Sequence, residues 1–97
     1  MISKSYYTYI LTNKYNKILY IGVTGNLKRR IYEHKGHYKS GFTQKYNVDK
    51  LVFYERFNNP MDAIKREKSL KNLLRNKKQK LINNFNPEWE DLYQKIV

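Results

Sequence analysis

The 97-residue sequence contains no cysteine and only two histidines. Without cysteine the protein can form neither a disulfide framework nor a thiolate metal site, and two histidines alone cannot make a structural zinc site. No apolar run reaches the ~18–20 residues needed to span a bilayer, and the N-terminus lacks the basic head and apolar stretch of a signal peptide. We therefore expect a soluble, cytoplasmic protein with no membrane partner.

Acidic residues are also scarce: the sequence has eight Asp and Glu against twenty Lys and Arg, which gives a formal net charge of +12. A small chain of this charge favours a polyanionic partner. Ten tyrosines accompany the cations, and aromatic rings stack on unpaired bases while cations contact phosphates. Nucleic acid is thus the predicted partner, although a merely basic, soluble surface would have the same composition.

The length suits one domain over residues 1–97, with no internal repeat or linker. Residues 6–12 and 17–23 are rich in aromatic and alternating residues, which predicts a β-hairpin turning at residues 13–16. A four-residue loop would place Tyr9 directly opposite Tyr20, with Cβ atoms ~4.5–5.5 Å apart. This tyrosine pair either stabilises the hairpin or belongs to a site.

A helix is predicted over residues 27–35, with Asn26 as its cap and Gly36 at its end. Its inward face carries Arg30 and His34, one turn apart. Each of these polar side chains has two open interpretations, as a boundary residue whose polar end reaches water or as a functional group.

Residues 37–48 predict a basic loop with a helical turn, and residues 50–57 alternate as a third strand. Leu51 and Phe53 would share one face of that strand, and Val52 would lie on the other. Asn86 and Pro87 then predict the start of a last short helix. Its apolar stripe would comprise Trp89, Leu92, Tyr93 and Ile96.

Asn59 and Pro60 predict the start of another helix, in which Glu67 occupies an apolar slot. A buried carboxylate is costly unless it is paired or binds a metal. Two interpretations of Glu67 therefore stay open: it forms a salt bridge with Lys71 or Arg30, or it binds a metal ion. The inward stripe of this helix would comprise Ala63, Glu67, Leu70 and Leu74.

Two tyrosine triplets, an arginine and a histidine on one helix, and an inward glutamate on another form an ordered set. This set resembles the GIY-YIG nuclease superfamily, and the tail resembles its small stand-alone bacterial branch, which is related to the N-terminal nuclease domain of UvrC. The matching segments are residues 7–10, 20–22, 27–30 with His34, 66–68, 77–78, 86–89 and 91–93.

The resemblance implies an α+β fold in which a three-stranded, mainly antiparallel sheet, made of the hairpin and the third strand, is flanked by helices. It also implies hydrolysis of phosphodiester bonds, in DNA rather than RNA, with one Mg²⁺ or Mn²⁺ ion. Gly22 and Asn86 would support the site. The basic residues expected to contact nucleic acid are Lys28, Arg29, Lys39, Lys45, Arg75, Lys77 and Lys78.

Carried over by resemblance, Glu67 would bind the metal and Arg30 would stabilise charge on the scissile phosphate. Tyr9 would act as general base or orient the attacking water, with Tyr20 and His34 assisting. A free phenol has a pKa of about 10, so Tyr9 would need help from the positive charge of Arg30 and the metal.

The chain departs from the family motif at its first triplet, where the family's glycine is Tyr7 and its isoleucine is Thr8, while Tyr9 is kept. Homing and repair relatives also carry separate DNA-binding domains, whereas this sequence ends soon after the nuclease core. We therefore expect an endonuclease that selects DNA structure or damage, as in repair and recombination. The alternatives are a non-catalytic nucleic-acid-binding module of the same fold and a basic protein-binding partner.

Overall fold

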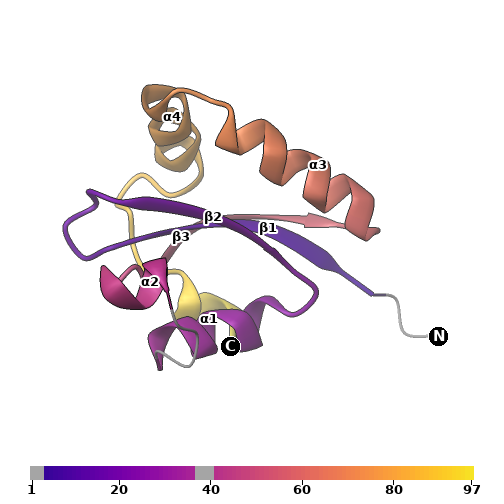
Figure 1. Ribbon diagram of the computed structural model, residues 1–97, viewed down its shortest axis with the longest axis horizontal. Helices are drawn as coiled ribbons and strands as arrows, with labels where there is room; N and C mark the ends of the chain where they lie inside the picture. The colour runs from indigo at the N-terminus through magenta and orange to yellow at the C-terminus, as the bar shows by residue number, and fades with distance from the viewer. Residues whose placement is uncertain (1–3, 37–40) are drawn as a thin grey trace.

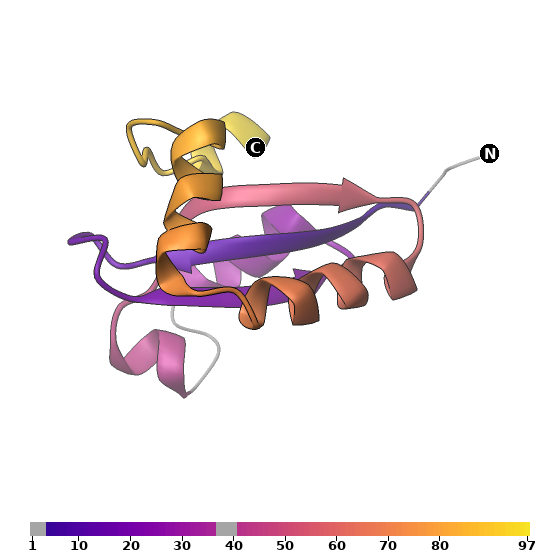
Figure 2. The same cartoon turned by 90° about the horizontal axis from the view of Figure 1, so that it is seen from above.

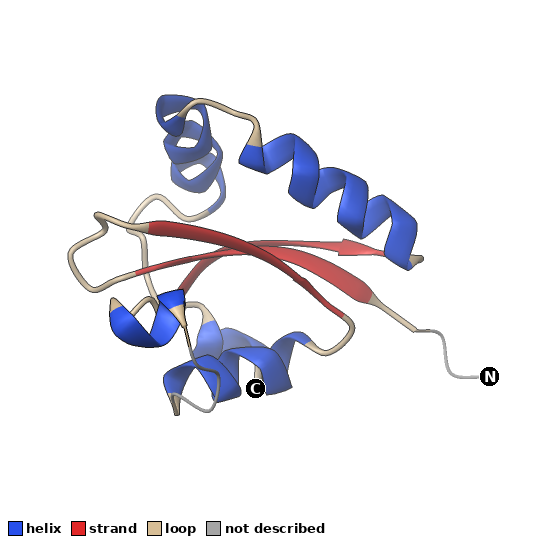
Figure 3. Cartoon of the chain, in the orientation of Figure 1, coloured by secondary structure: helices blue, strands red, loops and turns tan. Residues whose placement is uncertain are grey.

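The computed structural model describes residues 4–36 and 41–97, and in them a three-stranded antiparallel sheet lies between two layers of helices (Figures 1 and 3). The central strand is β1 (Tyr6–Thr12), which pairs with β2 (Leu19–Thr24) on one side and β3 (Lys50–Phe57) on the other. The predicted α+β class is confirmed. The helices are α1 (Leu27–Lys35), α2 (Phe42–Lys45), α3 (Pro60–Lys71), α4 (Arg75–Phe85) and α5 (Tyr93–Ile96).

Each face of the sheet has its own hydrophobic core, because successive side chains of β1 point in opposite directions. Tyr9 and Leu11 belong to the core beneath α1, and Ile10 belongs to the core beneath α3 and α4. Figure 2 shows α3 running along the sheet on the β2 side, with α1 behind the strands. None of the described helices is long and apolar enough to cross a bilayer.

Local capping signals place the starts of α1 and α3 as predicted. The Asn26 side chain accepts a hydrogen bond from the Arg29 backbone N–H at 3.1 Å, and α1 ends before Gly36. The Asn59 side chain likewise accepts from the Asp62 N–H at 2.9 Å at the start of α3. Short-range backbone chemistry thus determines where these two helices begin.

The hairpin register differs from the predicted one by two residues. Tyr9 pairs with Gly22, and Tyr20 pairs with Leu11. Residues 13–18 connect the strands, because the Asn13 side chain accepts hydrogen bonds from the backbone N–H groups of two residues that the prediction assigned to the second strand, at 2.8 and 3.3 Å. A shift of two residues preserves the face of every side chain, so Tyr9 and Tyr20 remain neighbours on one face, as diagonal partners.

Two further predictions about strand and helix faces are wrong. Ile10 pairs with Phe53 while the next residue, Leu11, pairs with Leu51, so Val52 is an extra residue in β3. This β-bulge puts Leu51 in the core beneath α1 and Phe53 in the core beneath α3, and the two do not share a face. Leu74 is 71% exposed, because α3 ends at Lys71 and the chain turns before α4.

The last helix is shorter than predicted. Only Tyr93–Ile96 is helical, and residues 86–92 form turns that Asn86 and Asp91 organise. Leu92 is buried in the core beneath α1, with Tyr93 and Ile96 packed against that core, whereas Trp89 packs against the other core. The expected apolar stripe is therefore divided between the two sides of the sheet.

Candidate active site

Tyr9 is completely buried at the centre of β1, and its ring crosses the backbone of its partner Gly22 in β2. A Cβ atom at residue 22 would lie 2.5 Å from the Tyr9 hydroxyl and 2.6 Å from Cζ, far inside van der Waals contact. Glycine is therefore required here, because it lets the phenol pass over the β2 backbone. Gly22 supports the site through this close approach.

His34 lies directly beside the Tyr9 hydroxyl. The Tyr9 Oη atom is 3.3 Å from His34 Nε2, and His34 Nδ1 is 3.2 Å from the hydroxyl of Thr43 in α2. His34 is buried, with 6% of its surface exposed. Hydroxyl groups can donate or accept, so the contacts with Tyr9 and Thr43 can be satisfied by either neutral tautomer of His34.

Tyr20 completes an aromatic cluster with these two side chains. Its ring centroid lies 6.5 Å from that of Tyr9 and 5.8 Å from that of His34. On its other side Tyr20 stacks on Phe42, whose ring is 5.0 Å from Tyr46. Phe42 and Tyr46 are exposed, so a row of rings leads from the buried Tyr9 through the half-buried Tyr20 to the surface.

Arg30 projects from the same helix as His34, and its side chain is 35% exposed. Its Nε atom lies 3.5 Å from a carboxylate oxygen of Glu33, one turn along α1. The structure shows no ion pair between Arg30 and Glu67 within the described residues. Of the two alternative salt bridges of Glu67, the one to Arg30 is therefore not formed, and the guanidinium instead contacts the half-buried Glu33 and acts on Tyr9.

Glu67 lies on α3, which covers the face of the sheet opposite to α1. Its side chain is 21% exposed, and its Oε2 atom lies 3.5 Å from Lys71 Nζ, the predicted partner one turn later. The Lys71 side chain is 54% exposed, and such surface pairs contribute only ~0.2–1 kcal/mol. Glu67 is close enough to Tyr9 for its charge to raise the pKa of the phenol.

Tyr9 is a neutral phenol in this environment. Burial raises its pKa well above the usual range, and the neighbouring Tyr20 adds to the shift. The charge and hydrogen bonding of Arg30 lower the pKa, as expected, but burial outweighs them. Arg30 thus acts on the pKa of Tyr9 in the expected direction, but in the protein alone its effect is smaller than that of burial.

Glu67 is the side chain of this site that could offer a carboxylate to a metal ion. Among residues 4–36 and 41–97, no group of three or more His, Cys, Asp or Glu side chains could hold a metal ion. Mg²⁺ is commonly bound by one or two carboxylates, with water and substrate phosphates as its other ligands. Glu67 fits this pattern, because its exposed ammonium partner is weakly held.

Asn86 is buried, and it secures the C-terminal segment. Its Nδ2 group donates to the backbone oxygens of Val52 at 3.2 Å and Glu90 at 2.8 Å, and its Oδ1 atom accepts from the Glu90 N–H at 3.1 Å. These contacts join β3 to the turn before α5. Any support that Asn86 gives to the site acts through the fold.

The basic residues predicted to contact nucleic acid lie on both layers. Lys28 and Arg29 are exposed on α1 and Lys45 on α2, while Lys77 and Lys78 lie on α4 across the sheet. Arg75 has a structural role, because its Nη2 group donates to the backbone oxygen of Lys17 at 2.6 Å and so ties α4 to the hairpin. Lys39 lies outside the described residues.

Two residues near the predicted site were missed by sequence reasoning. Thr43 holds one side of the His34 ring, and Phe42 covers Tyr20. Both belong to the segment interpreted as a basic loop. Its aromatic content was the only available signal, and nothing in the sequence distinguishes Thr43 from any other loop threonine.

Comparison with known proteins places this geometry in a family. Residues 5–81 match the GIY-YIG catalytic domain. The UPF0213 protein CPE1444 of Clostridium perfringens is 38% identical over 91 residues, spanning 94% of this chain and 96% of that protein. The UPF0213 protein NP_0776A of Natronomonas pharaonis is 33% identical over 81 residues, spanning 84% of this chain and 94% of that protein.

A solved structure agrees with these sequence matches. The solution NMR structure of the UPF0213 protein BH0048 from Bacillus halodurans superimposes with a TM-score of 0.57 at 29% identity, covering 90% of this chain and 92% of that one. The matched family is that of a nuclease domain, which implies a nuclease-type activity on nucleic acid. The chain belongs to the GIY-YIG family, among its small stand-alone UPF0213 members.

Proposed function

We propose that this protein is an endonuclease that hydrolyses phosphodiester bonds in DNA with one divalent metal ion, Mg²⁺ or Mn²⁺. The observation that carries the proposal is the buried pair of Tyr9 and His34, with Oη and Nε2 3.3 Å apart, beside an arginine and within electrostatic reach of a lone glutamate. The net charge of +12 suits a polyanionic substrate.

Arg30 would bind the scissile phosphate. Its guanidinium offers a forked pair of donors that match phosphate oxygens, and it stays charged at all working pH values. Binding would exchange the 3.5 Å contact with Glu33 for a stronger, better desolvated pair. A divalent ion held by Glu67 would supply Lewis-acid polarisation of a phosphoryl oxygen.

Tyr9 and His34 would move the proton of the attacking water together. Because burial keeps the phenol protonated, Tyr9 passes its own proton to His34 Nε2 as its oxygen accepts one from water. This relay forms no free phenolate. It requires the His34 tautomer in which Nδ1–H donates and Nε2 accepts, and Thr43 Oγ1 can accept the hydrogen bond from Nδ1–H in that tautomer.

Selectivity for DNA with unpaired bases would come from the exposed rings beside Tyr20. Phe42 and Tyr46 are 49% and 42% exposed, and base–aromatic stacking contributes ~1–3 kcal/mol per base. Branched, nicked or damaged DNA presents such bases next to a duplex. This preference would place the protein in repair or recombination in the cytoplasm.

The test is cleavage of labelled nicked, branched, single-stranded and intact duplex DNA by purified protein in Mg²⁺ or Mn²⁺. Glu67→Ala should abolish cleavage, whereas the matched variant Lys71→Ala, which removes only the ammonium partner, should retain it. Cleavage by the wild type no greater than by Glu67→Ala would refute the proposal. Equal losses in both variants would show that Glu67 acts only through its ion pair.

A non-catalytic nucleic-acid-binding module is the second candidate. The raised pKa of Tyr9 and the Glu67–Lys71 ion pair favour it, because both are ordinary structural states of these groups. It predicts salt-sensitive binding that needs no metal and survives Tyr9→Phe, Arg30→Ala and Glu67→Ala alike.

A further inference from the structure

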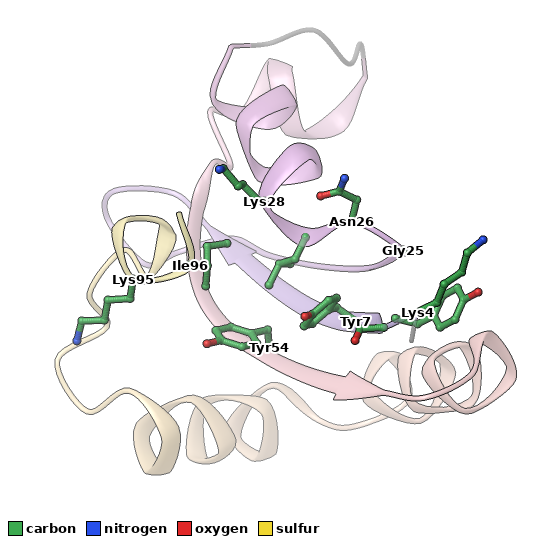
Figure 4. A pocket seen from close by; sticks show the side chains of 11 residues that line it. Lys4, Tyr7, Gly25, Asn26, Lys28, Tyr54, Lys95 and Ile96 are labelled. Carbon is green, nitrogen blue, oxygen red and sulfur yellow. The ribbon is translucent and has the colours of Figure 1, made fainter. Parts of the chain in front are cut away.

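A depression of about 680 Å³ lies at the N-terminal end of α1, separate from Tyr9 and His34 (Figure 4). Its walls come from β1, β3, α1 and α5, so distant parts of the chain build it together. None of the described residues that line it is acidic. Its cationic and aromatic members are Lys4, Tyr6, Tyr7, Lys28, Tyr54 and Lys95.

The lysines give this depression an uncompensated positive charge. Lys4 and Lys28 are exposed, and neither forms an ion pair with a described residue. Lys95 is 3.4 Å from Glu90, but these side chains are 68% and 54% exposed, so the pair is weak. Figure 4 shows Lys4, Lys28 and Lys95 spread around the perimeter. A ligand here would carry negative charge.

Two tyrosine rings lie between these lysines. Tyr7 and Tyr54 pack edge to face, with centroids 6.2 Å apart, and both are half-buried. Their hydroxyl groups have no hydrogen-bond partner within residues 4–36 and 41–97. Tyr7 stands where the GIY motif has glycine, so the departure from the motif adds a ring to this wall. Aromatic faces with free polar edges suit a planar, polar ligand.

The depression continues toward the site. A smaller hollow of about 270 Å³ is lined by Arg30, Arg29 and Glu33, and it shares Gly25 and Asn26 with the larger one. A strand whose phosphate lies at Arg30 can therefore cross the Gly25–Asn26 turn and enter the larger depression. This continuity favours an extended nucleic-acid strand over a free small molecule.

We propose that this depression binds an unpaired nucleotide of the substrate strand, a short distance from the phosphate that Arg30 holds. Its base packs against Tyr7 and Tyr54, and its phosphate is bound by Lys4 and Lys28. The inference rests on the proposed function, because Arg30 supplies the starting point of the strand. With Phe42 and Tyr46 at the other end of α1, unpaired bases would be bound on both flanks of the cut.

Binding is measured by fluorescence anisotropy with the full chain carrying Glu67→Ala, so that no DNA is cut. The probes are a blunt duplex and the same duplex with a short single-stranded extension at the 5′ or the 3′ end. One extension should tighten binding roughly tenfold, the effect of about one base–aromatic stack. Tyr7→Ala and Lys28→Ala should each remove most of this gain, and Tyr7→Phe should keep it.

Lys14→Ala is the charge-matched control, because Lys14 is exposed in the hairpin loop at the opposite end of β1. It should weaken binding of blunt and extended probes by the same factor. Equal effects of Lys28→Ala on both probes would overturn the proposal, since they would indicate unspecific charge attraction. Displacement of the extended probe by a free nucleoside monophosphate at equal concentration would also overturn it, in favour of a free-nucleotide site.

The proposed function can fail independently of this site. If the wild type cuts no substrate but Tyr7→Ala and Lys28→Ala abolish the gain from the extension, the nuclease proposal fails and the nucleotide site stands. If the wild type cuts DNA and both variants keep the gain, only the nucleotide site fails. Thermal unfolding of Tyr7→Ala identifies a folding defect, and the exposed Lys28 provides the test that does not perturb packing.

Discussion

Substituting Gly22 with alanine should disturb both the fold and the site through a single contact. The added Cβ would lie 2.5 Å from the Tyr9 hydroxyl and 2.6 Å from Cζ. Tyr9 is completely buried, and its ring is rigid, so it cannot swing into solvent. Overpacking of this kind costs about 1–3 kcal/mol. For a domain of this size, each 1 kcal/mol lowers the melting temperature by about 4–8 °C.

A double-mutant cycle isolates this contact. Gly22→Ala is measured by urea and thermal unfolding in the wild type and in a Tyr9→Leu background, where the clashing end of the ring is gone. The cost of the alanine should fall from about 2 kcal/mol to below about 0.5 kcal/mol, because the two residues couple through direct contact. In cleavage assays, Gly22→Ala should also reduce activity, because the added Cβ would displace the Tyr9 hydroxyl from His34.

The control for this cycle is Gly25→Ala. A Cβ at residue 25 would meet the Tyr6 ring at 3.7 Å, an ordinary contact, so its effect on the free energy of unfolding should stay within about 0.5 kcal/mol. If Gly22→Ala costs the same in the presence and absence of the Tyr9 ring, or no more than Gly25→Ala, the close approach is not the reason for glycine at this position.

Three further predictions concern single side chains. The raised pKa of Tyr9 means that its stabilising contribution is complete below the unfolded pKa of about 10 and is lost as the pH rises above it. Stability should therefore fall by up to ~1.4 kcal/mol per pH unit more steeply in the wild type than in Tyr9→Phe, and parallel curves from urea unfolding would contradict this. Thr43→Val should lower kcat about tenfold and shift its pH profile with KM unchanged, because His34 loses the hydroxyl that accepts from Nδ1–H in the tautomer the relay needs; Thr43→Ser should restore it, and loss of activity in Thr43→Ser as well would argue against the hydroxyl. Asn86→Ala should destabilise the protein by about 2–4 kcal/mol in chemical unfolding, since it leaves the buried Val52 carbonyl and the partly buried backbone groups of Glu90 unpaired, whereas a cost below about 1 kcal/mol would show that water replaces the amide.

Features encoded by neighbouring residues were predictable from the sequence. Asn26 and Asn59 cap helices with their own side chains, and such signals act over three residues. The end of α3 was not predictable in this way, because the periodic pattern continues to Leu74 while the chain turns after Lys71. Likewise, the β-bulge in β3 depends on pairing with a strand distant in sequence, and alternation alone cannot show it.

The candidate site was predictable only in part, for a similar reason. Arg30 and His34 stood out because polar groups on an inward helix face need partners. Their identification with phosphodiester chemistry came from the resemblance to a family, and periodicity alone left them as boundary residues. The partner of His34 on α2, Thr43, lies in a segment without periodicity, so only the three-dimensional structure reveals it.

The direction in which the pKa of Tyr9 shifts also could not be predicted from the sequence. Burial, which raises the pKa, and Arg30, which lowers it, act in opposite directions, and only the fold determines which dominates. Because burial dominates in the protein alone, the phenolate form of Tyr9 is disfavoured there. The proposed proton relay through His34 would avoid this cost, and it would make the 3.3 Å contact between Tyr9 Oη and His34 Nε2 the critical distance of the site.

The hairpin loop explains why that distance is possible. A loop of residues 13–16 would have placed Tyr20 directly opposite Tyr9, with two rings competing for the same space above the sheet. The longer loop, closed by the Asn13 side chain, moves Tyr20 two residues along and brings Gly22 opposite Tyr9. The Tyr9 ring can then lie across β2 and reach His34, with Tyr20 beside it. The register of the hairpin, more than the identity of its tyrosines, therefore determines whether the site can form.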